Sequence, residues 1–168
     1  LNVINGGQHA DNDVDFQEFM ILPIGFKSLT EALSSTHSVI TNIKKELKSR
    51  SLNTNLGDEG GFAPNLKSHL DVLDLICNSI SKAGFKLNDH FKISLDAASS
   101  EFYSDGKYNF EGNSYSTEEM ISVYENICKN YPIFSIEDAL NEEDYEGWVK
   151  ITNKLCLLYT SPSPRDDT

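Results

Sequence analysis

The feature that most restricts the fold of this chain is an alternation between short apolar segments and longer segments with helical periodicity. Residues 91–97 alternate between apolar and polar side chains, and residues 133–138 form a short apolar run, so both are predicted strands. Apolar residues recur every three or four positions over residues 28–50, 66–80, 116–131 and 142–155, which predicts four helices. Strands that alternate with helices in this way predict an α/β fold with a parallel sheet.

Local signals add detail to this prediction. Apolar residues 1–4 and 19–24 flank a polar, glycine-rich loop over residues 5–17, which predicts strand, loop and strand. The pair Asp105-Gly106 between aromatic-rich arms indicates a two-residue hairpin within residues 102–110. Ser116 and Glu119 form a capping box at the start of a helix that ends before Pro132.

Composition excludes several classes of function. The 168 residues include 14 basic and 26 acidic side chains, so the formal net charge is −12. A general nucleic-acid-binding protein needs a basic face for the phosphates, so neither a nucleic acid nor an anionic membrane surface is an expected partner. The same acidity favours divalent cations as partners.

The cysteines and the apolar segments indicate a cytoplasmic protein. Cys77, Cys128 and Cys156 are odd in number and contain no C-x-x-C pair, which is typical of reduced thiols rather than of a disulfide framework or a zinc site. The longest apolar stretch, residues 19–26, contains Pro23 and is too short to span a bilayer.

Both ends of the chain are unusual. It begins with Leu1 rather than Met, which leaves a missing N-terminal part possible. Residues 156–168 change to Ser, Pro and Thr without periodicity, where an α/β chain should supply its next strand. We expect this tail to be disordered and not native to the rest of the chain.

Two acidic residues end predicted strands, Asp96 and Glu137. The carboxyl ends of neighbouring parallel strands meet at one edge of a sheet, where catalytic and metal-binding groups gather. Two carboxylates from neighbouring strands are the oxygen ligands that Mg²⁺ prefers. A single such acid is often a helix N-cap instead, and Asp138 is a candidate for that structural role.

Other candidates lie in loops. Glu59 lies in the run Gly57-Asp58-Glu59-Gly60-Gly61, where glycines permit close approach of a ligand, although a tight surface turn explains the same residues. His9 lies in the glycine-rich loop, a better place for a ligand contact than a helix surface. The other histidines are interpreted as having no special role, and the acids of residues 142–146 as the first turn of a helix. These other histidines are His37, His69 and His90.

Four segments together resemble the enolase family. They are LNVINGGQHADNDVDFQEFMILPIG, NTNLGDEGGFAPNL, SLDAASSEFYSDGKY and YPIFSIEDALNEEDYEGW, in the family's order and at about its spacing. The resemblance implies a lyase, specifically a hydro-lyase (phosphopyruvate hydratase), that interconverts 2-phosphoglycerate and phosphoenolpyruvate in glycolysis and gluconeogenesis. It also implies two Mg²⁺ ions on a modified β/α (TIM-like) barrel, preceded in the family by a smaller N-terminal domain.

The resemblance assigns roles to individual residues. Asp96 and Glu137 match two of the three carboxylates that bind the tighter magnesium, and Glu59 matches the general acid that protonates the departing hydroxyl. His9 and Glu18 match residues around the substrate and its leaving group. Gln17-Glu18 is uninformative by spacing alone.

Parts of the family pattern are missing. The strand ending in Gly-Asp-Asp that carries the third metal ligand, the lysine base and the N-terminal domain have no counterpart. Residues 1–155 are therefore expected to form the first part of the barrel domain of a homodimeric parent protein, and to be inactive alone. The alternative is a non-enzymatic acidic module that binds a divalent metal or a protein partner.

Overall fold

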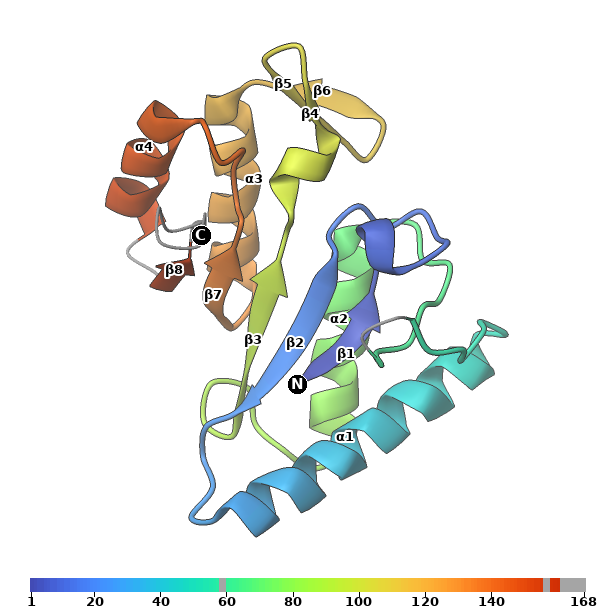
Figure 1. Cartoon of the computed structure of the whole chain (residues 1–168). Coiled ribbons are helices and arrows are strands. Elements are labelled where there is room, and N and C mark those ends of the chain that lie inside the picture. Colours follow the sequence, from blue (N-terminus) through green and yellow to red (C-terminus); the bar gives the residue numbers. More distant parts are fainter. Residues whose placement is uncertain (58–59, 156–157, 161–168) are drawn as a thin grey trace, which may run out of the picture.

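The computed structural model describes residues 1–57, 60–155 and 158–160, with side chains described for the first two ranges. Its main feature is a five-stranded sheet in the order β1-β2-β3-β7-β8 (Figure 1). The strands are β1 (Asn2–Asn5), β2 (Glu18–Pro23), β3 (Phe91–Asp96), β7 (Ile133–Glu137) and β8 (Leu158–Thr160). The strands predicted at residues 1–4, 19–24, 91–97 and 133–138 are all present in this sheet.

The directions of the strands correct the expected parallel sheet. Strand β2 is antiparallel to both β1 and β3, whereas β3, β7 and β8 run parallel to one another. The physical reason lies in the connections. A single crossover helix returns the chain to a parallel strand, but β1 and β2 are joined by a loop, and β2 and β3 by two consecutive helices. The sheet is therefore mixed.

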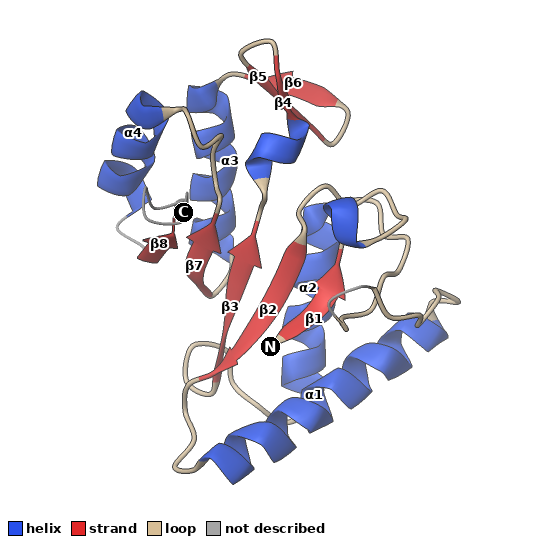
Figure 2. Ribbon diagram, in the orientation of Figure 1, coloured by secondary structure: helices blue, strands red, loops and turns tan. Residues whose placement is uncertain are grey.

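Four α-helices in the described part of the chain accompany the sheet and lie behind or beside it in the view of Figure 2. They are α1 (Leu29–Ser49), α2 (His69–Lys82), α3 (Thr117–Asn130) and α4 (Tyr145–Leu155). Ser28 and Ser68 cap the first two, and the predicted capping box of Ser116 and Glu119 is confirmed at the third. The helix predicted from residue 142 begins only at Tyr145, where Asp144 accepts a hydrogen bond from the backbone amide of Gly147 (3.0 Å).

A small second sheet follows the end of β3. A short 3-10 helix (Ser99–Phe102) leads into β4 (Tyr103–Ser104), β5 (Lys107–Phe110) and β6 (Asn113–Tyr115), which pair antiparallel in that order. The predicted two-residue turn is confirmed, because Asp105 and Gly106 adopt φ values of 52° and 76° between β4 and β5. Strand β6, for which the sequence shows no separate signal, extends this hairpin.

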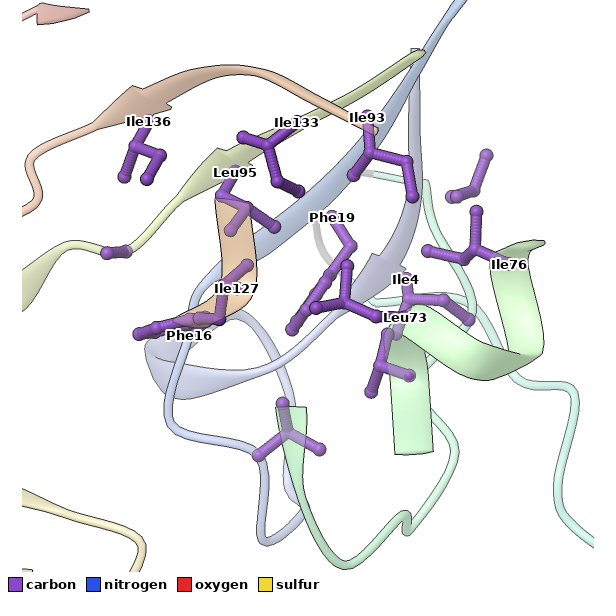
Figure 3. Packing of buried hydrophobic residues seen from close by; sticks show 14 of the residues in the cluster. Ile4, Phe16, Phe19, Leu73, Ile76, Ile93, Leu95, Ile127, Ile133 and Ile136 are labelled. Carbon is purple, nitrogen blue, oxygen red and sulfur yellow. The ribbon is translucent and has the colours of Figure 1, made fainter. Parts of the chain in front are cut away.

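The hydrophobic core lies between the helices and one face of the main sheet. Alternate residues of β3, including Ile93 and Leu95, are fully buried and pack with apolar side chains of α2 and α3 such as Ile76 and Ile127 (Figure 3). This alternation is the period of two that identified the strand in the sequence. Burial of this face is the main stabilising contribution to the fold.

The main sheet does not close on itself within the described residues, since β1 and β8 are its two edges. A mixed α/β chain with an unclosed sheet is consistent with the expected incomplete β/α barrel. The expectation that the whole tail is disordered is wrong for residues 158–160, which form β8 beside β7. The reason is that the chain returns to the sheet after α4. The other tail residues lie outside the described part.

None of the helices in the described ranges combines the length and the apolar composition that a membrane span requires.

Candidate functional site

Three carboxylates form a row across the end of the main sheet. Glu18 on β2 is the register partner of Asp96 on β3, and Asp96 is the register partner of Glu137 on β7. Register partners on neighbouring strands project from the same face of a sheet. The structure therefore brings together the two predicted metal ligands and adds Glu18, because the antiparallel β2 begins where β3 ends.

The Asp96 carboxylate is held through both of its oxygens. The backbone amide of Ala98 donates to Oδ1 (3.0 Å), and the side-chain amide of Gln17 donates to Oδ2 (3.4 Å). The backbone amide of Gln17 also donates to the Asp96 carbonyl (3.1 Å). Gln17 was uninformative in the sequence, and no local pattern identifies it, because its partner is 79 residues away.

Burial, followed by the negative charges of Glu137, Asp138 and Glu18, raises the pKa of Asp96 to about 6, although the hydrogen bond from the Ala98 amide acts in the opposite direction. Burial, followed by the charges of Glu137 and Glu142, likewise raises the pKa of Asp138. A carboxylate paired with a cation behaves in the opposite way, since a nearby positive charge favours ionisation. The row therefore concentrates negative charge at the end of the sheet where β3 and β7 finish and β2 begins.

The backbone is strained directly after both strand ends. Ala98 follows Asp96 by two residues with φ 45°, and Asp138 follows Glu137 directly with φ 46°. Left-handed backbone at residues other than glycine costs free energy and is concentrated at functional sites. Here it redirects the chain immediately beyond each carboxylate, and the amide of Ser99 donates to the Asp138 carbonyl (3.0 Å) to join the two turns.

His9 lies beside the same row. It is the last residue of a 3-10 helix (Gly7–His9), and its Nδ1 is 3.4 Å from Oε1 of Glu18. At this distance a protonated imidazole would form an ion pair with the Glu18 carboxylate. The buried His9 Nδ1 has no hydrogen-bond partner among the described residues. The two residues that the family resemblance places around a substrate thus lie next to each other.

A cavity of about 400 Å³ opens next to His9, between residues 8–11 on one side and residues 53–57 with Ala63 on the other. Polar groups dominate its lining, which comprises Gln8, His9, Ala10, Asp11, Asn53, Asn55, Leu56, Gly57 and Ala63. Its wall depends on Gly57, since a Cβ there would lie 2.2 Å from Nδ2 of the fully buried Asn5 and 2.7 Å from the carbonyl oxygen of His9. Asn5 was not singled out in the sequence.

Glu59, the predicted general acid, lies outside the described residues. The glycines that flank it are described. The amide of Gly57 donates to the carbonyl of Gly61 (2.8 Å), and Gly60 has φ 83°. The expectation that these glycines supply positive φ is confirmed at Gly60.

The carboxylates of Asp96 and Glu137 could supply some, but not all, of the oxygen ligands of a hard divalent cation. No group of three or more His, Cys, Asp or Glu side chains in the described ranges is arranged to hold a metal ion. Mg²⁺ is nevertheless commonly bound through one or two carboxylates, with water and substrate oxygens completing its shell. Asp96 and Glu137 fit that smaller role.

Comparison with known proteins shows which family this chain matches. The family described as "Enolase, C-terminal TIM barrel domain" matches residues 1–157. The chain is 55% identical over 154 residues to the enolase of Campylobacter lari, and this match covers 92% of the chain and 37% of that protein. It is 53% identical, with the same coverage, to the enolases of Campylobacter jejuni subsp. jejuni and Corynebacterium kroppenstedtii. The chain thus spans about a third of the length of these relatives.

Proposed function

The chain belongs to the enolase family, and from this premise we propose that it carries part of the site at which 2-phosphoglycerate is reversibly dehydrated to phosphoenolpyruvate. The observation that carries the proposal is the register pairing of Asp96 with Glu137 beside Glu18. Because the chain covers 37% of its relatives, this lyase activity is proposed for the whole protein of which it forms part. We propose glycolysis and gluconeogenesis as the pathways and a cytoplasmic homodimer as the parent protein.

The reaction explains why carboxylates must be gathered here. Removal of the C2 proton, which lies next to a carboxylate, turns that carboxylate into a doubly negative enediolate. Mg²⁺ bound at this edge would neutralise that charge as it develops. We propose that Asp96 and Glu137 hold the ion. Their concentrated negative charge supports this role, because a cation would offset both the burial and the carboxylate repulsion that raise the pKa of Asp96.

The remaining residues would bind and orient the substrate. His9 and Glu18 lie next to each other at 3.4 Å and are proposed to face the substrate and its leaving hydroxyl. Gln17 and the amide of Ala98 hold both oxygens of Asp96, so that carboxylate would not need to reorient when a ligand arrives. The role of Glu59 as the general acid rests on its match to the family pattern alone.

We further propose that this chain does not turn over substrate by itself. Two carboxylates supply only part of a metal shell, and the described residues contain no larger metal-binding group. The alternative, a non-enzymatic acidic module, uses the same carboxylates to bind a divalent ion or a protein. Catalysis and metal binding must therefore be measured separately.

The test uses the full 168-residue chain in two assays. Formation of phosphoenolpyruvate from 2-phosphoglycerate and Mg²⁺ is followed by absorbance, and Mg²⁺ binding is followed by calorimetry. The variants are Asp96→Asn and Glu137→Gln, with Glu101→Gln as a control because Glu101 is exposed and lies outside the row.

We expect no turnover, with weak Mg²⁺ binding that both row variants abolish and the control retains. Turnover above background would overturn the proposed inactivity. Tight Mg²⁺ binding lost in both row variants would favour the metal-binding module. Binding that neither row variant changes would reject Asp96 and Glu137 as ligands.

A further inference from the structure

Three consecutive residues at the end of loop 6–17 connect the carboxylate row to the small sheet. Oδ2 of Asp15 accepts a hydrogen bond from the backbone amide of Glu111 (2.5 Å). Phe16 is fully buried and stacks on Phe110 with a centroid distance of 4.8 Å. Gln17 then holds Asp96 through its side-chain and backbone amides. The segment therefore contacts the small sheet and the candidate site at the same time.

Glu111 fastens the small sheet to helix α2. It lies in the turn between β5 and β6, and its Oε1 accepts from the backbone amide of His69 (2.6 Å) and lies 2.8 Å from His69 Nδ1. Burial raises the pKa of this carboxyl, but hydrogen bonds from the ring and backbone of His69 outweigh burial, and the pKa is lowered overall. The ionised form of Glu111 thus belongs to the folded structure.

The environment of His69 corrects the interpretation that it has no special role. The residue is 7% exposed. Its ring lies 5.5 Å from that of Phe16 and 5.1 Å from that of Phe110. Removal of the Glu111 carboxylate would leave buried donors of His69 without their acceptor, a costly change in the protein interior.

The backbone of Glu111 shows that this contact maintains the turn. Glu111 has φ 48°, a left-handed conformation that is unfavourable for a residue with a side chain. Such a conformation persists where surrounding contacts impose it. The contacts with His69 restrain the side chain, and the turn in this conformation presents the Glu111 amide to Asp15.

We infer that Glu111 is a positioning residue that couples the small sheet to loop 6–17 and thereby keeps Gln17 on Asp96. Without its carboxylate the turn relaxes, Asp15 loses its amide partner, and the loop loosens up to Gln17. The inference rests on the proposed function only for the role of Asp96 as a ligand. The coupling between Glu111 and Gln17 is a property of the fold and is measurable without metal or substrate.

The test is amide hydrogen exchange, measured by NMR on the full chain without Mg²⁺. Reporters of the loop are the amides of Gln17 and Gly6, which donate to Asp96 and Gln17 carbonyls, respectively. The reference is the amide of Ile93 on β3, which donates to the carbonyl of Pro132 (2.9 Å), the residue directly before β7. The variants are Glu111→Ala and Glu111→Gln, with Glu101→Ala as the matched control at an exposed acid.

In Glu111→Ala we expect the Gln17 and Gly6 amides to exchange at least about tenfold faster, because local opening sets their protection. Ile93 should be unchanged. Glu111→Gln should restore part of the protection, since its amide oxygen still accepts from the His69 backbone, whereas a general structural defect would not respond to this change. Equal exchange at Gln17 in the wild type and Glu111→Ala, or acceleration in Glu101→Ala as well, would overturn the inference.

A second variant covers the case in which Glu111→Ala does not fold. Asp15→Ala removes the loop's acceptor but leaves the contact of Glu111 with His69 in place. It should accelerate exchange at Gln17 and Gly6, and unchanged exchange there would overturn the coupling. Calorimetric Mg²⁺ binding that neither Asp96→Asn nor Glu137→Gln changes would reject the proposed metal ligands without altering either exchange result.

Discussion

Asp96 and Glu137 are register partners at the ends of the parallel strands β3 and β7. Two acids at paired positions on one face of a sheet repel each other, and Glu18 on β2 extends the row on the other side of Asp96. The backbone maintains this arrangement through hydrogen bonds, including one from the amide of Ala97 to the Glu137 carbonyl (3.0 Å). The row therefore lowers the stability of the folded state locally, and interactions elsewhere in the fold compensate for it.

This cost gives the chain a pH dependence that Asp96→Asn should remove. In the folded state the pKa of Asp96 is raised to about 6, against about 3.9 in an unfolded chain. Protonated Asp96 therefore stabilises the folded state relative to ionised Asp96. This contribution is complete below the unfolded-state pKa and is lost as the pH rises through the folded-state pKa. Asn should therefore raise the free energy of unfolding by about 1 to 2 kcal/mol at neutral pH, a figure reduced for partial exposure.

The measurement is chemical denaturation of both proteins between about pH 4 and pH 8, the range that contains both pKa values. The two stability curves should converge at the acidic end and separate as pH rises. A constant difference across the range would mean that Asp96 does not titrate in this window.

Addition of Mg²⁺ should stabilise the chain at neutral pH, and chelation should reverse the effect. A ligand that binds only the folded state at about 100 times its dissociation constant adds about 2.7 kcal/mol to the free energy of unfolding. Thermal unfolding with and without a chelator measures this. Glu137→Gln should lose the response, whereas Glu101→Gln, at an exposed acid outside the row, should keep it.

Replacement of Gly57 by Ala should destabilise the chain through steric overlap. The added Cβ would lie 2.2 Å from Nδ2 of the fully buried Asn5 and 2.7 Å from the backbone carbonyl oxygen of His9. We expect a loss of about 2 to 3 kcal/mol in the free energy of unfolding, as for overpacked interiors. Gly60→Ala is the comparison, since that site is open but has φ 83°.

Gly60→Ala should cost only about 1 kcal/mol, the penalty of left-handed backbone alone. Equal losses of unfolding free energy in Gly57→Ala and Gly60→Ala would show that neighbouring groups move to remove the overlap with Asn5. Urea denaturation at one pH measures both.

Asp144 joins three elements and should be the most sensitive acid of residues 142–146. Its Oδ2 accepts from Tyr108 Oη (3.1 Å) and Thr117 Oγ1 (2.6 Å), and its Oδ1 accepts from the Gly147 amide. Asp144→Ala should lower the free energy of unfolding by about 2 to 3 kcal/mol, because partly buried donors lose their acceptor. Glu143→Ala, at an exposed neighbour, should change it by less than about 0.5 kcal/mol. Similar losses in denaturant titrations would contradict this structural role.

The local elements were predictable because their signals lie within a few residues of one another. The capping box of Ser116 and Glu119 and the turn at Asp105-Gly106 each involve neighbours in the chain. The position of Asp96 and Glu137 at neighbouring strand ends was also predictable, since parallel strands bring their carboxyl ends to one edge.

The sequence by itself therefore determined the helices, most of the strands, the family and the two acids at the strand ends. Only the tertiary structure decided that β2 runs antiparallel and places Glu18 next to Asp96, that Gln17 holds Asp96, and that Glu111 pairs with His69. Gln17 and Asp96 are 79 residues apart in the chain, and His69 and Glu111 are 42 residues apart. Hydrophobic periodicity records which side of an element is buried, but not which distant polar groups the packing of those elements brings within hydrogen-bond distance.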